Sequence, residues 1–452
     1  MKLKKYRLAD IGKVITGKTP STSIAENYAC GNIPFYTPED VAKGLGMMGR
    51  NNRFISQTGF EEIASNTISG ESVLVGCIGS DMGNVAYSNI TCATNQQINS
   101  ITQFKNGAEP LYVYYLLSTM KPYFQKIAGS TTTPILPKSV FEEIEIYLPG
   151  IKYQKDIVSI LYALDRKIAL NHQINDNLEA MAKQLYDYWF VQFDFPNEEG
   201  KPYKSSGGVM VWNEKLKREI PKGWHCGTLL DIAEYTNGLA CQKYRPTDDN
   251  KLPVIKIKEM HDGLSVDTEW VKADIPDEVK VFDGDVLFSW SASLEVMLWA
   301  YGNGGLNQHI FKVTSKNGYP RSFYFYQLIH YIGVFKQMAE ARKTTMGHIT
   351  QDHLRQSSIV LPPDVDIANK LEEKLCPIFD AIVKNSQEIM TLTKQRDELL
   401  PILMNGQASV NYHLFVLFIS KIIVYYKETN INFEYERNNT KRFRWNEIGF
   451  DR

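Results

Sequence analysis

The sequence predicts an α+β protein in which one mixed α/β module occurs twice and two long helices pair with each other, giving a pseudo-two-fold internal repeat. Three observations predict this class: a low-identity repeat with a period of about 213 residues, short β-rich runs in each half, and a long heptad-patterned segment at the end of each half. Such a repeat indicates a duplicated domain, because solenoids are built from several short units.

Length and composition agree with several folded domains. The chain has 452 residues, 43% of them hydrophobic, with 50 Lys and Arg against 51 Asp and Glu. This predicts about two to four domains and excludes global disorder. A formal net charge of −1 excludes a uniformly basic protein that coats nucleic acid, but it allows a protein that is neutral as a whole and has one basic face.

Cysteine usage and hydropathy predict a cytoplasmic protein. Six cysteines without a CxxC pattern favour neither a disulfide framework nor a structural zinc site. The N-terminal stretch lacks the apolar run of a signal peptide. The longest apolar-rich run, Leu414–Tyr426, is broken by Ser420 and Lys421 and is too short to span a bilayer.

The two halves share short motifs in the same order. Leu8-Ala9-Asp10-Ile11 corresponds to Leu230-Asp231-Ile232-Ala233, and Asn95-Gln96-Gln97 corresponds to Asn307-Gln308-His309. Thr131-Thr132 through Leu148-Pro149 aligns without a gap with Thr344-Thr345 through Leu361-Pro362. The shared order and spacing predict one architecture for both halves.

Each half begins with short β-rich runs separated by Gly, Pro and Asn, followed by one helical stretch. The runs include Ile33–Tyr36, Ser72–Ile78, Leu252–Ile257 and Asp285–Trp290, and the helical stretches are Leu111–Ile127 and Ser322–Ala341. We therefore expect a first module over 1–150, a helix over 151–190, a linker over 191–210, a second module over 211–363, a second helix over 364–407 and a tail over 408–452.

Both long helices carry heptads with an Asn at a matching position, Asn171 and Asn385. Narrow apolar seams suit a partner helix, and a buried Asn fixes the register of such a pair at some cost in stability. The alternative is that each helix packs on its own module. Pro377 predicts a kink or a late start of the second helix. The expected seam residues are Ile157, Leu161, Leu164, Ile168, Asn171, Leu178, Leu185, Leu371, Leu375, Ile378, Ile382, Asn385, Ile389, Leu392 and Leu399.

Three stretches resemble the specificity subunit of type I restriction-modification systems. They are Leu148-Pro149 with Gln154 and Ile160–Ile168 at the entry to the first helix, Asn177–Ala182 with Leu185–Phe193 at its exit, and Gln395–Gly406 at the end of the second helix. Together with the repeat, the resemblance covers residues 1–407.

The resemblance implies that each module is a target recognition domain that reads one half of a split site on double-stranded DNA. It implies that the two helices form an antiparallel coiled coil that acts as a ruler. Two modification subunits would dock on the helices and methylate adenine with S-adenosylmethionine. Restriction subunits would use ATP and Mg²⁺ for translocation and cleavage. The chain itself would bind no cofactor and would have no active site.

Elementary geometry supports the same interpretation. DNA readers with two-fold symmetry place their half-sites about 34–36 Å apart. Helices of about 35–40 residues are about 50–60 Å long, and a paired set of them is stiff enough to hold two readers at that spacing. Because the two modules differ in sequence, we expect an asymmetric target.

Candidate DNA contacts lie in polar loops, because Arg, Lys, Asn and Gln read base edges while Lys, Thr and backbone amides hold phosphates. Matched residues such as Asn95 and Asn307 favour a structural or phosphate-positioning role, since the two modules would read different bases. Unmatched residues such as Gln97, Lys243 and Arg245 are stronger candidates for base readout. The candidates are Lys18, Thr19, Asn84, Asn95, Gln96, Gln97, Thr131, Thr132, Lys243, Arg245, Lys258, Asn307, Gln308, Lys343, Thr344, Thr345 and His348.

Gly12–Thr19 fits the P-loop pattern and carries the alternative hypothesis, a self-contained ATP-dependent DNA-processing enzyme. The context is unfavourable, because Pro20 follows the pattern and Leu239 replaces Lys18 in the second half. A repeat-containing adhesin or scaffold is disfavoured by the missing secretion signal. Pro276–Lys280 has the letters of a nuclease motif, but the adjacency of its acidic residues predicts a solvated turn.

The remaining patterns predict no catalysis and no metal site. The eight His and the acidic residues show no metal-ligand spacing, and no adenine-methyltransferase motif occurs. Trp189-Phe190 and Leu400–Met404 fit either internal packing or a subunit dock. The segment 411–452 has no counterpart in the first half, so we interpret it as an appended helix or as readthrough after a frameshift or recombination. Trimming at Gln407 should leave function intact if it is an appendage.

Overall fold

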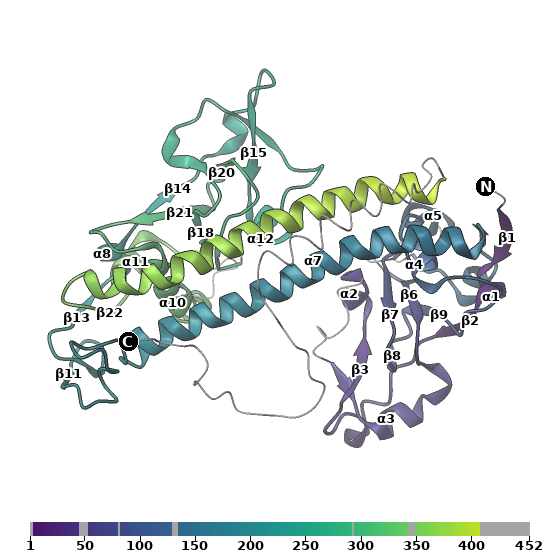
Figure 1. Cartoon of the computed structure of the whole chain (residues 1–452), viewed down its shortest axis with the longest axis horizontal. Coiled ribbons are helices and arrows are strands. Elements are labelled where there is room, and N and C mark those ends of the chain that lie inside the picture. The colour runs from purple at the N-terminus through teal and green to yellow at the C-terminus, as the bar shows by residue number, and fades with distance from the viewer. Residues whose placement is uncertain are drawn as a thin grey trace. The chain divides into compact units, whose positions relative to one another are not determined.

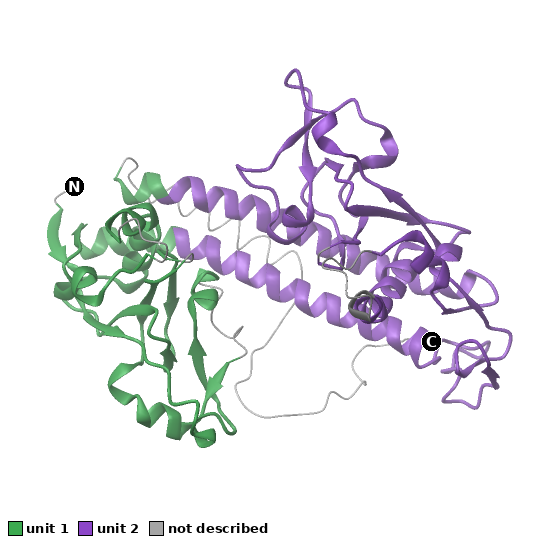
Figure 2. Ribbon diagram, turned by 180° about the vertical axis from the view of Figure 1, so that it is seen from behind, with its two compact units in different colours: residues 1–47, 51–160, 401–452 green, residues 48–50, 161–400 purple. Residues whose placement is uncertain are grey.

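A computed structural model describes residues 3–44, 53–79, 82–128, 134–291, 293–341 and 349–406. The chain divides into two compact units (Figure 2), residues 1–47, 51–160 and 401–452 in unit 1 and residues 48–50 and 161–400 in unit 2. The expectations for the segment 411–452 lie outside the described residues. Among the described residues, no helix combines the length and apolar character needed to cross a membrane.

Module one, in unit 1, is built on two four-stranded sheets and one two-stranded sheet. The strand orders are β2-β9-β6-β7, β4-β3-β8-β5 and β1-β10. The first sheet is antiparallel throughout, whereas β3 and β8 pair in parallel. The strands are β1 Lys4–Arg7, β2 Lys13–Thr16, β3 Ile33–Tyr36, β4 Phe54–Ile55, β5 Thr67–Ile68, β6 Ser72–Gly76, β7 Val85–Ser88, β8 Cys92–Thr94, β9 Ile98–Thr102 and β10 Glu145–Leu148.

Short helices cover and connect these sheets. The expected single helix over Leu111–Ile127 is two helices, because the chain turns at Thr119 and Met120. The second of them starts with Pro122 in its first turn, where a missing backbone N–H costs nothing. The helices are α1 Leu8–Ile11, α2 Pro38–Val41, α3 Gln57–Glu62, α4 Pro110–Ser118, α5 Lys121–Ile127 and α6 Lys138–Glu142, with short 3₁₀ turns at Ala25–Asn27 and Ala64–Asn66.

Module two, in unit 2, has the same strand topology. Its sheets have the orders β14-β21-β18-β19, β16-β15-β20-β17 and β13-β22, so each strand of module one has a counterpart in the same place. The predicted internal repeat is therefore confirmed. The strands are β13 His225–Gly227, β14 Ala233–Asn237, β15 Lys251–Ile255, β16 Trp270–Lys272, β17 Lys280–Val281, β18 Val286–Ser289, β19 Glu295–Leu298, β20 Gly304–Leu306, β21 Ile310–Ser315 and β22 Ile359–Leu361.

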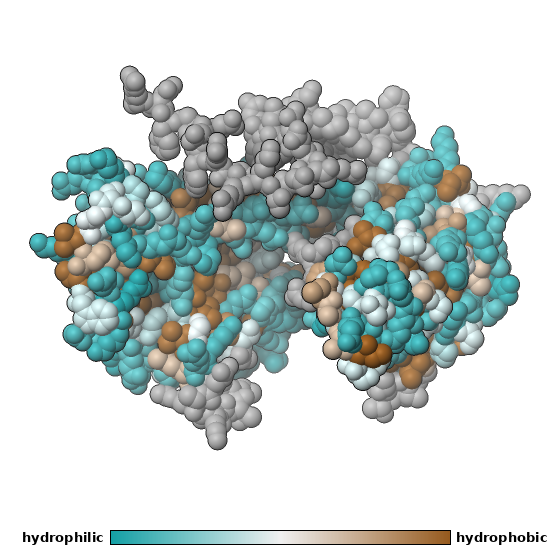
Figure 3. Space-filling view, turned by 90° about the horizontal axis from the view of Figure 1, so that it is seen from below, coloured by the Kyte–Doolittle hydropathy of each residue, from teal (hydrophilic) through white to brown (hydrophobic). Residues whose placement is uncertain are grey.

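Module two also has features of its own. A hairpin of β11 Met210–Asn213 and β12 Arg218–Pro221 precedes it. More than half of Trp212 in this hairpin is exposed. On the face of the molecule shown in Figure 3, hydrophobic residues lie scattered among hydrophilic ones. The helices of module two are α8 Leu229–Ile232, α9 Ile257–Asp262, α10 Arg321–Ala341 and α11 Gln351–Gln356, with 3₁₀ turns at Cys241–Lys243 and Asp277–Val279.

The two long helices are α7, Ile151–Tyr186, and α12, Asp366–Met404. Within unit 2 they lie side by side and run in opposite directions (Figure 1). Of the seam residues in this part, Leu161, Leu164 and Leu392 are buried, and Leu178 is half-buried. The predicted antiparallel pairing is therefore confirmed for the part of the helices that unit 2 contains.

Polar side chains join the helices along this seam. Arg396 Nη1 donates to Asp165 Oδ1 at 2.9 Å, and Lys167 forms an ion pair with Glu388. Further along, the side chains of three asparagines form hydrogen bonds between the helices. Asn171 Nδ2 donates to Glu388 Oε2 at 2.8 Å, and Asn385 Nδ2 donates to Asn175 Oδ1 at 2.9 Å. Because each bond requires one specific partner, these contacts fix which residues of the two helices face each other.

The alternative that each helix packs on a module also holds in part. The first turns of α12 place Leu371, Leu375 and Phe379 in the hydrophobic core of module two. The structure assigns α12 without a break from Asp366 through Pro377, so the late start predicted from Pro377 is wrong. The burial of neighbouring side chains in the module-two core stabilises the helix across the proline.

Candidate nucleic-acid interface

In module one, loops from several strand ends meet at one edge of the sheet β2-β9-β6-β7. Thr16 at the end of β2 pairs with Asn99 near the start of β9, and Val75 near the end of β6 pairs with the same residue. The loops after β2 and before β9 therefore lie side by side, together with the turn between β6 and β7. We call this edge the module-one loop edge; it consists of residues 17–20, 37–43, 53, 82–84 and 95–97.

Two backbone hydrogen bonds hold these loops in place. Gly17 N donates to Ile98 O at 3.0 Å, and Asn95 N donates to Tyr36 O at 3.1 Å, which ties the end of β3 to the same edge. A methyl group on Gly17 would lie 2.2 Å from Asn95 O. The close approach of the two loops therefore requires glycine at this position.

Module two repeats this construction. Gly238 N donates to Ile310 O at 3.2 Å, and Asn307 N donates to Ile255 O at 3.0 Å. A methyl group on Gly238 would lie 2.3 Å from Asn307 O. The module-two loop edge consists of residues 238–245, 256–259, 269, 290–291 and 307–309.

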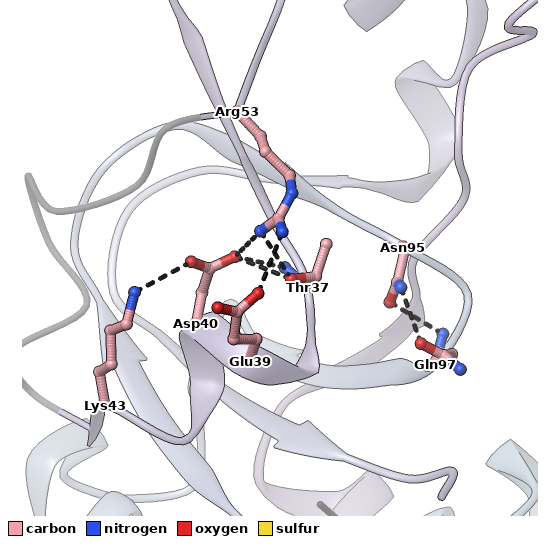
Figure 4. Close-up of polar contacts among 7 residues, drawn as sticks. All are labelled: Thr37, Glu39, Asp40, Lys43, Arg53, Asn95 and Gln97. Carbon is pink, nitrogen blue, oxygen red and sulfur yellow. Dashed lines mark hydrogen bonds and ion pairs between the residues drawn. The ribbon is translucent and has the colours of Figure 1, made fainter. Parts of the chain in front are cut away.

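The structure brings most of the predicted module-one candidates to this edge. Thr19 Oγ1 donates to Gln96 Oε1 at 2.9 Å, Lys121 Nζ donates to Asn84 Oδ1 at 2.7 Å, and Lys18 is exposed. Asn95 Oδ1 accepts the backbone N–H of Gln97 at 3.1 Å, and the two side chains bond at 3.0 Å (Figure 4). Thr131 and Thr132 lie outside the described residues.

At the module-two loop edge, Lys243, Arg245 and Lys258 are exposed. Asn307 is buried, and its Oδ1 accepts the backbone N–H of His309 at 3.3 Å. Asn95 and Asn307 thus close the same side-chain turn, which is a structural task at both edges. Gln308 is half-buried, and its Nε2 lies 3.4 Å from His309 Nε2. Lys343, Thr344, Thr345 and His348 lie outside the described residues.

Sequence reasoning missed Arg53 and Asp40 at the first edge and Glu269 at the second. Arg53 donates to Thr37 Oγ1, Asp40 Oδ2 and Glu39 Oε2 at 3.1, 3.3 and 3.0 Å (Figure 4). The hydrogen bond with Glu39 raises the pKa of the Arg53 guanidinium, and the hydrogen bond with Lys256 lowers the pKa of Glu269. A sequence signal was present for Asp40 alone, since Thr37–Asp40 and Lys256–Glu259 share an N-cap spacing.

The structure contradicts the alternative hypothesis that Gly12–Thr19 is a P-loop. Lys13–Thr16, in the middle of the pattern, is strand β2, and its backbone pairs with β9. A phosphate-binding loop instead needs a glycine-rich turn whose free N–H groups open a helix. The other motif, Pro276–Lys280, contains the 3₁₀ turn Asp277–Val279 with the side chain of Asp277 almost fully exposed, as predicted.

The two apolar motifs near the helix ends differ in how far they are buried. Trp189 and Phe190 are buried in the hydrophobic core of module two, on a π-helical turn that follows α7 over Asp187–Val191. In Leu400–Met404, Leu403 and Met404 are buried whereas Ile402 is exposed, so this motif still fits either role. No group of His, Cys, Asp and Glu in the described part of the chain could hold a metal ion.

The fold defines a class of protein in which one α/β module occurs twice and two long helices pair. Comparison with known proteins gives the family. The family model for the type I restriction modification DNA specificity domain matches residues 2–180 and 221–396. The chain belongs to this family, whose members are the non-catalytic specificity subunits of type I restriction-modification complexes.

Relatives match over most of the chain. The specificity subunit of the type I restriction enzyme MjaIX from Methanocaldococcus jannaschii is 29% identical over 422 residues, which is 89% of this chain and 93% of that protein. The HindI specificity subunit from Haemophilus influenzae is 24% identical and covers 66% of this chain and 77% of its own length. The crystal structure of the S subunit from M. genitalium has the same fold, with a TM-score of 0.56 at 13% identity over 89% of this chain and 96% of that one.

Proposed function

We propose that the chain recognises a split, asymmetric site on double-stranded DNA, one half through each module, and that the helix pair sets the distance between the halves. The observation that carries this proposal is the construction of the two loop edges. Both have the same backbone frame, held by equivalent hydrogen bonds, yet they present different side chains. Two copies of one frame with different side chains suit two half-sites of different sequence.

We further propose that two modification subunits and restriction subunits assemble on this chain in the cytoplasm. The internal repeat supports two equivalent docking positions along the helix pair. In this assembly the modification subunits methylate adenine with S-adenosylmethionine, and the restriction subunits use ATP and Mg²⁺. The chain itself binds none of these cofactors and contributes recognition and spacing.

The decisive experiment is methylome sequencing of cells that express the chain with the modification subunit of its own system. The expected result is methylated adenine in a motif of two unlike half-sites separated by a fixed gap of unspecified bases. Cells that express the modification subunit alone are the control and should lack the motif. A contiguous or palindromic motif, or no motif at all, would contradict the proposal.

Assembly and cofactor use are tested separately. Native mass spectrometry of the co-expressed complex should show two modification subunits for each copy of this chain. Calorimetric titration of the isolated chain with a non-hydrolysable ATP analogue should show no binding. Saturable ATP-analogue binding by the isolated chain, or one modification subunit per chain, would overturn the corresponding statement.

A further inference from the structure

The two loop edges contain equivalent positions whose charges are opposite, and Arg53 and Glu269 form one such pair. Their equivalence is fixed by the backbone: Phe35 N on β3 donates to Arg53 O at 3.0 Å, and Val254 N on β15 donates to Glu269 O at 2.8 Å. Each residue immediately precedes the strand, β4 or β16, that pairs antiparallel with β3 or β15. The two side chains therefore start from the same point of the shared frame.

The frame around these positions is the same in both modules. In module one the buried carboxylate of Asp40 accepts the backbone N–H of Thr37 at 2.9 Å. In module two the buried carboxylate of Glu259 accepts the backbone N–H of Lys256 at 3.2 Å. A buried acid thus closes the first turn of α2 and of α9, so this part of the edge has a structural role in both modules.

The exposed charged groups on this frame differ in sign between the two modules. In module one, Arg53 is held by Glu39 and Asp40 beside the uncharged Thr37. In module two the cap residue is Lys256, whose Nζ lies 2.5 Å from Glu269 Oε1, and Lys258 stands where module one has Glu39. In module one the cation precedes the strand, as Arg53, and its exposed carboxylate partner, Glu39, lies on the helix. In module two the cation is at the helix cap, as Lys256, and its carboxylate partner, Glu269, precedes the strand.

Resting on the proposed function, we infer that Arg53 and Glu269 are specificity-determining residues, Arg53 selecting guanine in the half-site of module one and Glu269 selecting cytosine in that of module two. Phosphates are the same at every site, so a phosphate-holding position should keep its charge in both modules. A position that inverts its charge serves something that differs between the half-sites, and base edges are what differs. Arginine donates to guanine O6 and N7, and a carboxylate accepts from cytosine N4.

The geometry supports this assignment. The side chain of Arg53 is 48% exposed and that of Glu269 is 63% exposed, so both are open to a ligand. The ion pairs hold both head groups in place before a ligand binds, which lowers the entropy lost on binding. Figure 4 shows the Arg53 cluster beside Asn95 and Gln97, on the same edge as the other candidate contacts.

The test uses the full complex with its modification subunits and duplexes that carry the methylome-defined site, with each specified base pair replaced in turn. For R53Q, the preference for one guanine in the module-one half-site should fall about 10- to 100-fold, while the other half-site is read as before. E269Q should produce the same loss at one cytosine of the module-two half-site. R53K retains the positive charge beside Asp40 but lacks the arginine fork, and it should also lose the guanine preference.

Matched controls come from the strand pair β1-β10, where Lys5 and Glu145 form an exposed ion pair at 2.7 Å away from the loop edges. K5Q and E145Q remove the same charges and should leave every base preference unchanged. Equal weakening of all duplexes by R53Q and R53K, or a loss of preference in the wrong half-site, would overturn the inference. If the unmodified complex showed no split site, the proposed function itself would fail.

Discussion

Gly17 and Gly238 are equivalent single residues on which both loop edges depend. At either one a methyl group would lie within 2.4 Å of a backbone carbonyl oxygen of the neighbouring loop. We expect G17A and G238A each to lower the free energy of unfolding by about 1–3 kcal/mol, because the loops must separate to admit the new carbon. Urea unfolding measures this loss. G333A, in an exposed turn of α10 with open space around it, is the matched control and should be neutral or slightly stabilising.

The thiols of Cys77 and Cys92 should be protected in the folded chain. Burial raises the pKa of each to about 12, whereas an unfolded thiol titrates near 9.0. At pH 8 a thiol-specific reagent should modify the exposed Cys30 rapidly and these two only after addition of urea. Rapid labelling of Cys92 in the folded protein would show that its surroundings open readily.

The same pKa values predict a loss of stability in alkali. Well below pH 9 both states carry the thiol proton, so the contribution is constant. As the pH rises from 9 towards 12, the unfolded chain releases protons that the folded chain keeps, and the free energy of unfolding falls. Urea midpoints at pH 8 and pH 10.5 should show this decrease. The substitution C30S, at the exposed cysteine, is the control.

At the scale of elements, the helix seam combines buried apolar side chains with polar contacts that select which residues of the two helices face each other. Asn175 is buried, accepts a hydrogen bond from Asn385 and donates to Ser386 Oγ at 3.1 Å. Replacing both asparagines by leucine should raise the urea midpoint, because well-packed apolar side chains replace desolvated amides. It should also broaden the register of the pair. The distribution of distances between spin labels on α7 and α12 would detect this change. If the distribution stayed narrow and unchanged, the ion pairs alone would set the register.

Much of the seam followed from the sequence, but its polar contacts did not. Heptad spacing identifies Leu161, Leu164 and Leu392 as inward-facing because burial repeats with the helical period. A charged residue on a helix can be solvated or paired, so nothing in the sequence selects Glu388 as the partner of Lys167. Arg53 was missed for a similar reason, since its role depends on which strand its backbone joins. Trp189 could be recognised as apolar, but only the fold shows that it packs internally.

At the scale of the whole molecule, the proposed ruler has a direct test. Deleting the facing heptads Arg166–His172 and Glu388–Lys394 would shorten each helix by about 10 Å. At about 3.4 Å per base pair, the preferred gap between half-sites should shorten by about three base pairs, or binding should be lost if the modules then face different sides of the duplex. Methylome sequencing measures the gap. An unchanged gap would show that the helices do not set it.

The strand pairs β1-β10 and β13-β22 have a consequence for how such proteins diversify. Because the first and last strands of a module are hydrogen-bonded to each other, the chain enters and leaves the module at neighbouring points. A genetic crossover that replaced the whole segment between these strands would therefore leave the entry and exit points, and the long helix that follows each module, in place. A new half-specificity would then arise in a single event, with the other half left untouched.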